Sequence, residues 1–483
     1  MRKVLLLLAA SAAALAPASA QGPRYLDPRD VAEAQRQNAE LIQELGGAES
    51  GPRAAYVQLV GSRVAAFSGV ANPGQTLHFT MLNSPVENAM SVPGGYVYIT
   101  RQLLALMDNE SELAFALGHE TGHIAANHAH ARQQYAQRNP WGVFGQIMGA
   151  ILGGSPIGNV ITQQAALQTL SFSRDQEYQA DALALRYMSA AGYDPVGGPG
   201  ILAALTRDAA LQSRIQGRTN RQTPEWASTH PLSENRMQRA LAQARVIGRL
   251  GTGVTNRDAF LAQLEGEYVD DDPEQGIVDG PLFTHPDLRI QFQVPPGYLM
   301  SNGTTAVTIK GSAGQAQFSG GRYGGGLETY ILEVFRQLTR GRMQVPIPPP
   351  QRTFINGMPA AFTTARIQSS SGVVDVSVVA YQWDAQHIYH FIMLTPGGAG
   401  IGPFVPMVNS LRRITPAEAA AIRPRIIDVV TVGPGDTVQS LAGRMAYRDF
   451  KLDRFLALNR LGANSRLAPG QKVKLVVYGA RRS

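Results

Sequence analysis

The stretch NESELAFALGHETGH, residues 109–123, decides the fold of this chain. Asn109, with Glu112 three residues later, is the pattern that caps the start of a helix, so a helix is expected to begin at the next residue. On that helix His119 and His123 lie one turn apart on the same face, close enough for both imidazoles to hold one metal ion. The stretch therefore predicts a metal site built on an α-helix.

Glu120 stands beside these histidines and suits the role of a general base. Zinc lowers the pKa of a water molecule that it binds, and a neighbouring carboxylate can take the proton as the water attacks a polarised carbonyl. Two further histidines are not expected to bind this ion. His128 would lie opposite His119 on a continuing helix, and His130 would lie about 10 Å beyond His123.

A second helical stretch, SRDQEYQAD at residues 173–181, supplies a third ligand. Glu177 and Asp181 are four residues apart, so they share one face of that helix. Glu177 can bind zinc, and Asp181 can accept a hydrogen bond from a ligand histidine and fix its tautomer. Two histidines and one glutamate leave one position open, which is typical of a catalytic site. A pair of surface acids is the alternative.

Together these motifs resemble the HtpX-like and BepA-like zinc metallopeptidases, gluzincins related to the CAAX prenyl proteases. The resemblance covers roughly residues 30–250. It rests on Asn88-Ala89-Met90 with Pro93-Gly94-Gly95-Tyr96-Val97-Tyr98, on His119 to His123, on Glu177 to Asp181, and on Thr229-His230-Pro231 with Arg236. It implies an α-rich zincin-type metallopeptidase domain with a small β-sheet. It also implies one Zn²⁺ per chain, with His119, His123 and Glu177 as ligands and Glu120 as the base.

The resemblance assigns roles to His230 and to one strand as well. In related periplasmic members the equivalent histidine can approach the metal, where it caps a resting state or stabilises the transition state. An ordinary loop histidine is the alternative. Residues Gly95, Tyr96, Val97 and Tyr98 are interpreted as a strand flanking the cleft, which pairs with an extended peptide through its backbone. A plain core strand is the alternative here.

The chain is too long for one domain, because 483 residues exceed the usual domain size. Its hydrophobic content of 44% is typical of globular domains with packed cores. The peptidase domain is predicted at residues 21–255, followed by a polar linker at 256–280. A separate α+β domain of unknown role is predicted at 281–415. Its strands are indicated by alternating apolar residues, as at 288–294, and one helix is expected at about 327–339.

Residues 427–478 resemble a LysM module, a small βααβ fold that binds N-acetylglucosamine polymers such as peptidoglycan. The resemblance rests on Pro434-Gly435-Asp436-Thr437, on Leu458-Asn459 and on Pro469-Gly470-Gln471. The span between Ala442 and Asn459 is longer than usual, which leaves glycan binding open. Ten basic and three acidic residues from Val429 to Ser483 suit an anionic wall polymer.

Residues 1–20 have the form of a cleavable signal peptide. A basic start, the apolar run Val4–Leu15 and the small residues Ala18-Ser19-Ala20 predict a mature start at Gln21. The run is shorter than the ~20 residues that span a bilayer, so an uncleaved anchor is the less favoured alternative. The chain contains no cysteine, which excludes disulfides and a lipid-modified cysteine. We expect a periplasmic or secreted protein with no transmembrane span in the mature chain and no nucleic-acid partner.

These patterns favour a zinc endopeptidase that cuts unfolded or misassembled envelope proteins. Two alternatives stay open. One is a chaperone or assembly factor whose metal site is held closed by His230. The other is a hydrolase of peptidoglycan crosslinks, suggested only by the LysM resemblance.

Overall fold

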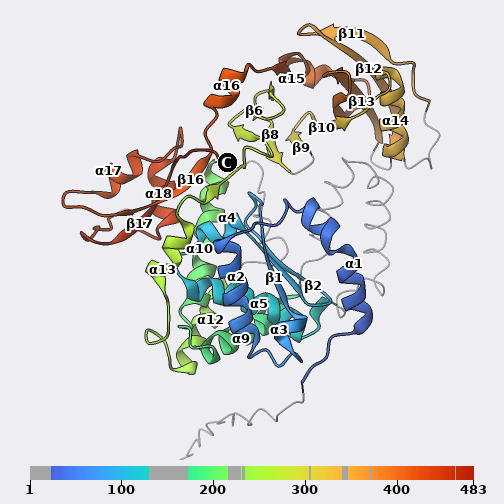
Figure 1. The fold of residues 1–483 in the computed structure, drawn as a ribbon. Coiled ribbons are helices and arrows are strands. Elements are labelled where there is room, and N and C mark those ends of the chain that lie inside the picture. The colour runs from blue at the N-terminus through green and yellow to red at the C-terminus, as the bar shows by residue number, and fades with distance from the viewer. Residues whose placement is uncertain are drawn as a thin grey trace, which may run out of the picture.

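The computed structural model describes residues 23–129, 172–215, 230, 234–303, 306–339, 346–369, 372–462 and 464–482. The expected signal peptide lies outside these residues. An N-terminal domain, a middle domain and a C-terminal module make up the described chain (Figure 1). None of the helices in these ranges combines the length and the apolar character that a membrane crossing requires.

The N-terminal domain packs helices around a small three-stranded sheet. Its strands are β1 (His78–Leu82), β2 (Ala89–Val92) and β3 (Tyr96–Thr100), in the order β1-β3-β2, with β1 parallel and β2 antiparallel to β3. Its helices are α1 (Pro28–Glu44), α2 (Pro52–Ala65), α3 (Pro73–Thr76), α4 (Arg101–Leu106), α5 (Glu110–Ala125), α9 (Arg174–Ala190), α10 (Gly197–Ile215), α12 (Glu234–Ile247) and α13 (Arg257–Leu264). Buried apolar side chains of α2, β3 and α5 form the centre of its core.

Helices α5 and α9 lie against each other at short range. Asn109 caps α5 as predicted, because its side-chain oxygen accepts a hydrogen bond from the backbone of Glu112. Ser173 caps α9 with a complete capping box. Gly122 permits the close approach, since a Cβ atom added there would lie only 3.3 Å from the carbonyl oxygen of Ala180. Side chains at adjacent positions of the two helices are thereby brought together.

The middle domain is a sandwich of two antiparallel sheets with one covering helix. The larger sheet has the order β11-β12-β13-β14-β10-β9-β8, and the smaller has the order β15-β7-β6-β5. Helix α14 (Leu327–Thr339), at the predicted position, covers one face of the larger sheet through Ile331 and Phe335. Phe283 and Phe292 of the smaller sheet pack on the other face.

The remaining elements of this domain are short. The strands are β5 (Ile277–Asp279), β6 (Leu282–His285), β7 (Ile290–Gln293), β8 (Leu299–Asn302), β9 (Val307–Gly311), β10 (Gly314–Arg322), β11 (Gln351–Ile355), β12 (Met358–Ser369), β13 (Gly372–Gln382), β14 (His387–Pro396) and β15 (Arg412–Arg413). The helices are η1 (Gly402–Phe404), α15 (Val405–Ser410) and α16 (Pro416–Ala421).

The C-terminal module has the predicted order strand, helix, helix, strand. It consists of β16 (Arg425–Thr431), α17 (Val438–Gly443), α18 (Lys451–Leu458) and β17 (Lys472–Tyr478), with β16 antiparallel to β17. Strand β4 (Tyr268–Val269) adds a third strand by pairing with β16. The closer likeness to LysM modules stays a prediction.

The predicted linker at residues 256–280 is wrong. It contains α13, β4 and β5, and Phe260 and Leu264 of α13 are completely buried in the core. The acidic run Asp270-Asp271-Asp272 is typical of a polar connector, but the eight-residue helix before it packs into the core. The chain therefore enters the middle domain from β4 and leaves it into β16.

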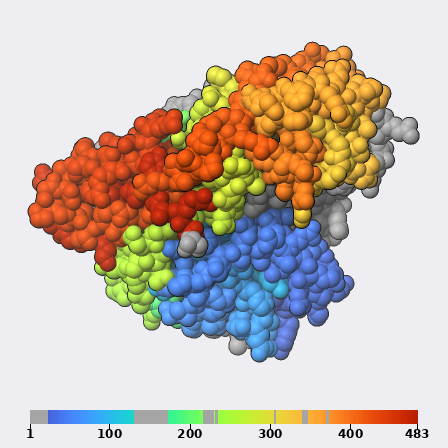
Figure 2. All heavy atoms as spheres, turned by 45° about the horizontal axis from the view of Figure 1, so that its top comes forward, coloured from blue at the N-terminus to red at the C-terminus, as the bar shows by residue number. Residues whose placement is uncertain are grey.

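Two basic side chains fasten the C-terminal module to the N-terminal domain. Arg460 forms a two-pronged ion pair with Glu112 in the first turn of α5. Lys474 is completely buried, and its Nζ donates hydrogen bonds to the carbonyl oxygens of Ala105 at 2.8 Å and Met107 at 2.6 Å, at the end of α4. The module lies in continuous contact with the N-terminal domain (Figure 2). The two share one hydrophobic core.

Candidate metal centre

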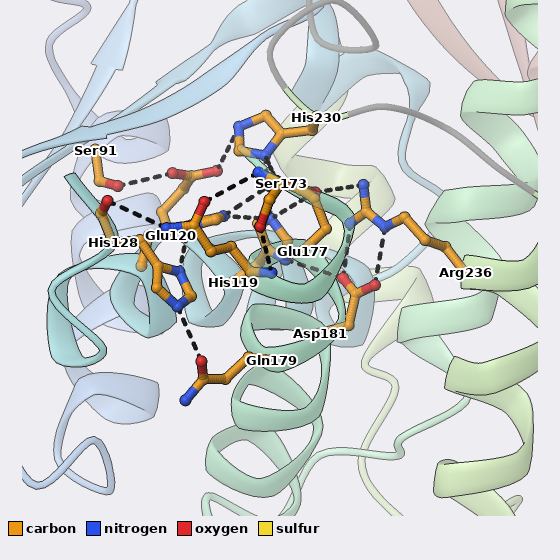
Figure 3. Close-up of polar contacts among 12 residues, drawn as sticks. Ser91, His119, Glu120, His128, Ser173, Glu177, Gln179, Asp181, His230 and Arg236 are labelled. Atoms are coloured by element: carbon orange, nitrogen blue, oxygen red, sulfur yellow. Dashed lines mark hydrogen bonds and ion pairs between the residues drawn. The ribbon is translucent and has the colours of Figure 1, made fainter. Parts of the chain in front are cut away.

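Four buried side chains from three segments converge where α5 meets α9 (Figure 3). His119 and His123 come from α5, Glu177 comes from α9, and His230 comes from the segment before α12. Each is at most 2% exposed. One candidate ligand atom of each residue lies within 4.8 Å of those of the others. The structure thus brings together the three predicted ligands and adds His230.

The donor atoms are spaced as in a metal coordination shell. Nε2 of His119 lies 3.0 Å from Nε2 of His123, and these nitrogens lie 3.6 Å and 3.5 Å from the carboxylate oxygens of Glu177. Ligands that are each ~2.1 Å from a tetrahedral zinc ion are about 3.4 Å from one another. Nitrogen lone pairs and a carboxylate that face each other repel unless a cation lies between them. The arrangement fits one zinc-sized cation.

Charged partners hold two of these groups in place. Nδ1 of His119 lies 3.0 Å from Oδ1 of Asp181, where the sequence placed an orienting carboxylate. Arg236 of α12 donates to Asp181 through Nη2 at 2.7 Å, and its Nη1 lies 2.5 Å from Oε2 of Glu177. One guanidinium therefore positions both the carboxylate of the candidate ligand Glu177 and the carboxylate that faces the candidate ligand His119.

The electrostatics of the site keep Glu177 ionised. Burial by itself would raise the pKa of this carboxyl group, but His230, His123 and Arg236 outweigh it and hold the pKa well below its usual value. Burial has the opposite effect on His123, whose pKa lies well below that of a free imidazole, so the ring is neutral. An ionised carboxylate and a neutral imidazole are the forms that bind metal ions.

Glu120 lies between the cluster and strand β2. Its Oε2 accepts a hydrogen bond from Oγ of Ser91 at 2.9 Å, and its Oε1 lies 3.4 Å from Nε2 of His230. Nδ1 of His230 lies 2.9 Å from Oε1 of Glu177 and 3.2 Å from Nε2 of His119. His230 thus fills the space between the predicted base and the predicted ligands.

His128 belongs to the site without being one of the four clustered residues. Helix α5 ends at Ala125, and Asn127 takes a left-handed backbone with φ 56°, so the chain turns back. Nδ1 of His128 then lies 2.8 Å from Nδ1 of His123, and its Nε2 lies 3.1 Å from Oε1 of Gln179. The expected position on the opposite face of a continuing helix is therefore wrong.

Three side chains at the site gave no signal in the sequence. Ser91 and Gln179 contact site residues through hydrogen bonds, and the ring of Phe172 stacks on that of His123 with 3.7 Å between centroids. Serine, glutamine and phenylalanine are common everywhere, so only the fold reveals their roles. His130 lies outside the described residues.

The strand predicted to bind a peptide is the central strand of the small sheet. Gly95 belongs to the turn before β3, and Tyr96, Val97 and Tyr98 lie in β3, the central strand, which pairs with β1 on one edge and with β2 on the other. Its backbone groups are used within the sheet and cannot pair with a substrate. In the described part of the chain, the other edge of β2 pairs with no strand, and β2 carries Ser91.

A cavity of about 780 Å³ opens beside the cluster. Its walls are Ser91–Gly94 at the end of β2, His123–Ala125 at the end of α5, and Arg24–Asp30 at the start of α1. The volume falls in the range of ligand pockets. The free edge of β2 and one of the clustered histidines therefore face the same space.

Comparisons with known proteins agree with this geometry. Residues 52–244 match the model of peptidase family M48. The beta-barrel assembly-enhancing protease of Escherichia coli (strain K12) is 30% identical over 243 residues, which are 44% of this chain and 47% of that protein. The mitochondrial metalloendopeptidase OMA1 of Schizosaccharomyces pombe is 30% identical over 188 residues, 39% of this chain and 52% of that protein. The chain spans about half the length of these curated relatives.

Among solved structures, the match to cyanobacterial PsbP of Synechocystis sp. PCC 6803 covers 28% of this chain and 91% of the PsbP chain, with 9% sequence identity. Its TM-score of 0.24 is too low to bear on the fold. The matched segment 52–244 runs from α2 into α12 and includes all four clustered residues. The N-terminal domain of this chain therefore contains a segment, residues 52–244, that matches peptidase family M48.

Proposed function

We propose that this chain is a zinc-dependent endopeptidase with His119, His123 and Glu177 as the metal ligands. The observation that carries the proposal is the spacing of 3.0–3.6 Å between two imidazole nitrogens and a carboxylate, with Glu120 beside them. A zinc ion at this position would supply a Lewis acid that polarises the substrate carbonyl and acidifies water. The buried, paired ligand set supports one ion per chain.

Glu120 is the general base in this proposal. Its carboxylate takes the proton from the attacking water and passes it to the leaving amine nitrogen. Ser91 holds Oε2 through a hydrogen bond of 2.9 Å, which leaves Oε1 directed toward the cluster. Arg236 keeps the carboxylate of Glu177 in its ligand position during these proton transfers.

The free edge of β2 is the proposed binding site for the peptide backbone. Pairing with an edge strand uses main-chain hydrogen bonds and places few demands on the substrate sequence. Such binding suits unfolded chains, which expose extended backbone.

Misassembled or unfolded envelope proteins in the periplasm are the substrates that we propose. The predicted signal peptide supports this compartment, and the name of the E. coli relative, a beta-barrel assembly-enhancing protease, supports the substrate class. Binding of peptidoglycan by the C-terminal module stays a prediction. Two basic residues of that module, Arg460 and Lys474, contact the N-terminal domain and are not available to an anionic wall polymer.

A chaperone or assembly factor with a closed metal site is a second candidate. The position of His230, 2.9 Å from Glu177 and 3.4 Å from Glu120, supports it, because the imidazole occupies space that a substrate carbonyl and water need. In the first proposal the same residue either closes a resting enzyme or stabilises the transition state.

Zinc content and cleavage of casein by the purified chain test these proposals together. We expect one zinc per chain, cleavage by the wild type, and a Glu120→Gln variant that keeps its zinc and loses cleavage. Faster cleavage by His230→Ala would identify this residue as a cap, and slower cleavage would identify it as a transition-state stabiliser. A zinc-loaded wild type that fails to cut, together with an equally inactive His230→Ala variant, would favour the chaperone.

A further inference from the structure

The two ligand histidines are oriented by different kinds of partner. A neutral imidazole binds a metal through one nitrogen only when the proton sits on the other nitrogen. Nδ1 of His119 faces Asp181 at 3.0 Å, and a carboxylate can only accept, so the proton stays on Nδ1. Nδ1 of His123 faces Nδ1 of His128 at 2.8 Å. A histidine can donate or accept, so this contact by itself leaves the tautomer of His123 undecided.

Gln179 removes that ambiguity. Its Oε1 lies 3.1 Å from Nε2 of His128, and an amide oxygen can only accept. The proton of His128 is then on Nε2, so its Nδ1 must accept a hydrogen bond from Nδ1 of His123. The lone pair of His123 is thereby left on Nε2, the atom 3.0 Å from Nε2 of His119 and 3.5 Å from Glu177.

The opposite order of donors would abolish the metal site. It would place the proton of His123 on Nε2, directed at the other ligands, where no cation could approach. The position of His128 holds the productive order in place. The residue is 4% exposed, so little solvent can compete for its two ring nitrogens.

Helix α9 carries both parts of this arrangement. Glu177 supplies a ligand, and Gln179, two residues further along, contacts the histidine that orients a ligand on α5. The left-handed turn at Asn127 is what returns His128 to the space between the two helices. Docking of α9 on α5 therefore assembles the ligands and sets the tautomer of His123 in the same step.

We propose that His128 and Gln179 are positioning residues that hold His123 in its metal-binding tautomer through a one-way chain of two hydrogen bonds. The inference rests on the proposed function, because it requires that His123 bind a metal. It assigns the preorganisation of one ligand to two residues that touch neither metal nor substrate.

The test is the zinc dissociation constant of the purified full-length chain, measured by competition with a chromophoric chelator. Gln179→Glu keeps an acceptor and is expected to retain the affinity, whereas Gln179→Leu is expected to weaken it about tenfold. Gln179→Lys offers only donors and is expected to weaken it about a hundredfold, the upper end of such effects. The visible spectrum of the cobalt-loaded Gln179→Lys chain should show the loss of a nitrogen ligand.

Gln176→Leu is the matched control. This substitution removes a glutamine from the same turn of α9. It deletes the hydrogen bond that Gln176 accepts at the helix cap and the one that it donates to the backbone of His128. The contacts of the His128 ring with His123 and Gln179 stay intact. Its melting temperature should fall while its zinc affinity stays that of the wild type. Equal affinities across the Gln179 series would overturn this inference alone. A wild-type chain that binds no zinc would overturn the proposed function and this inference with it.

Discussion

Removal of the Arg460 side chain is expected to loosen the attachment of the C-terminal module to α5. Both terminal nitrogens of Arg460 contact the carboxylate of Glu112, which is 1% exposed. Arg460 also has a left-handed backbone with φ 56°. That conformation costs a residue with a side chain about 1–2 kcal/mol, and the ion pair offsets this strain.

The two effects set the expected change in the free energy of unfolding. Loss of one partner of a buried ion pair costs about 3–5 kcal/mol. Glu112 keeps a hydrogen bond of 3.0 Å from the backbone of Asp108 and lies at a helix N-terminus, so we expect the lower end for Arg460→Ala, about 3 kcal/mol. Arg460→Gly loses the same pair but relieves the backbone strain, so its cost should be smaller by about 1 kcal/mol.

Urea unfolding at pH 7, followed by circular dichroism and tryptophan fluorescence, measures these changes. Arg444→Ala is the control, because Arg444 pairs with Asp428 at 3.6 Å and their side chains are 51% and 32% exposed. Such a pair contributes at most about 1 kcal/mol. The reasoning is refuted if Arg460→Ala is no more destabilising than Arg444→Ala, or if Arg460→Gly is the worse of the two Arg460 variants.

Three further predictions concern the site and the middle domain. Gly122→Ala puts a Cβ atom 3.3 Å from the carbonyl oxygen of Ala180, so α9 must shift. We expect the zinc affinity to fall about tenfold because Glu177 moves with α9. An unchanged affinity in chelator competition would contradict this. Ser91→Ala frees one oxygen of Glu120, so kcat on a fluorogenic peptide should fall about tenfold while zinc content stays at one per chain; an unchanged kcat would remove Ser91 from the site. Burial lowers the pKa of His390 from 6.5 to about 4. The stability that the neutral ring contributes is therefore fully present above about pH 6.5 and is lost as the pH falls toward 4. The free energy of unfolding should fall by about 3 kcal/mol over this range. Urea midpoints measured across this range should fall less steeply for His390→Gln than for the wild type, and equal slopes would be inconsistent with this pKa.

The clustering of the candidate ligands was predictable because the information about them is local. The spacing of His119 and His123, and that of Glu177 and Asp181, places each pair on one helix face whatever the rest of the chain does. The cap at Asn109 is local too, and the structure confirms it. Signals of this kind depend on residues within one or two turns.

Contacts between distant segments could not be predicted in the same way. Arg460 and Glu112 are 348 positions apart, and no pattern near either residue points to the other. The residues of β3 alternate like those of any strand, and only the order of the sheet shows that both edges are paired. The position predicted for His128 is wrong because helix α5 ends at Ala125 and the left-handed residue Asn127 turns the chain back.

The pairing of β4 with β16 has a consequence for how this chain can vary. Val269, before the middle domain, is the ladder partner of Arg425, after it. The middle domain is therefore inserted between two strands that pair with each other, in the place where a simple hairpin would have its turn. Because the chain enters and leaves the middle domain at adjacent positions, this domain can be replaced by a tight turn or by another fold without disturbing the core that holds the histidines. Sequence changes can thus accumulate in the middle domain while the framework of the candidate metal site stays constant.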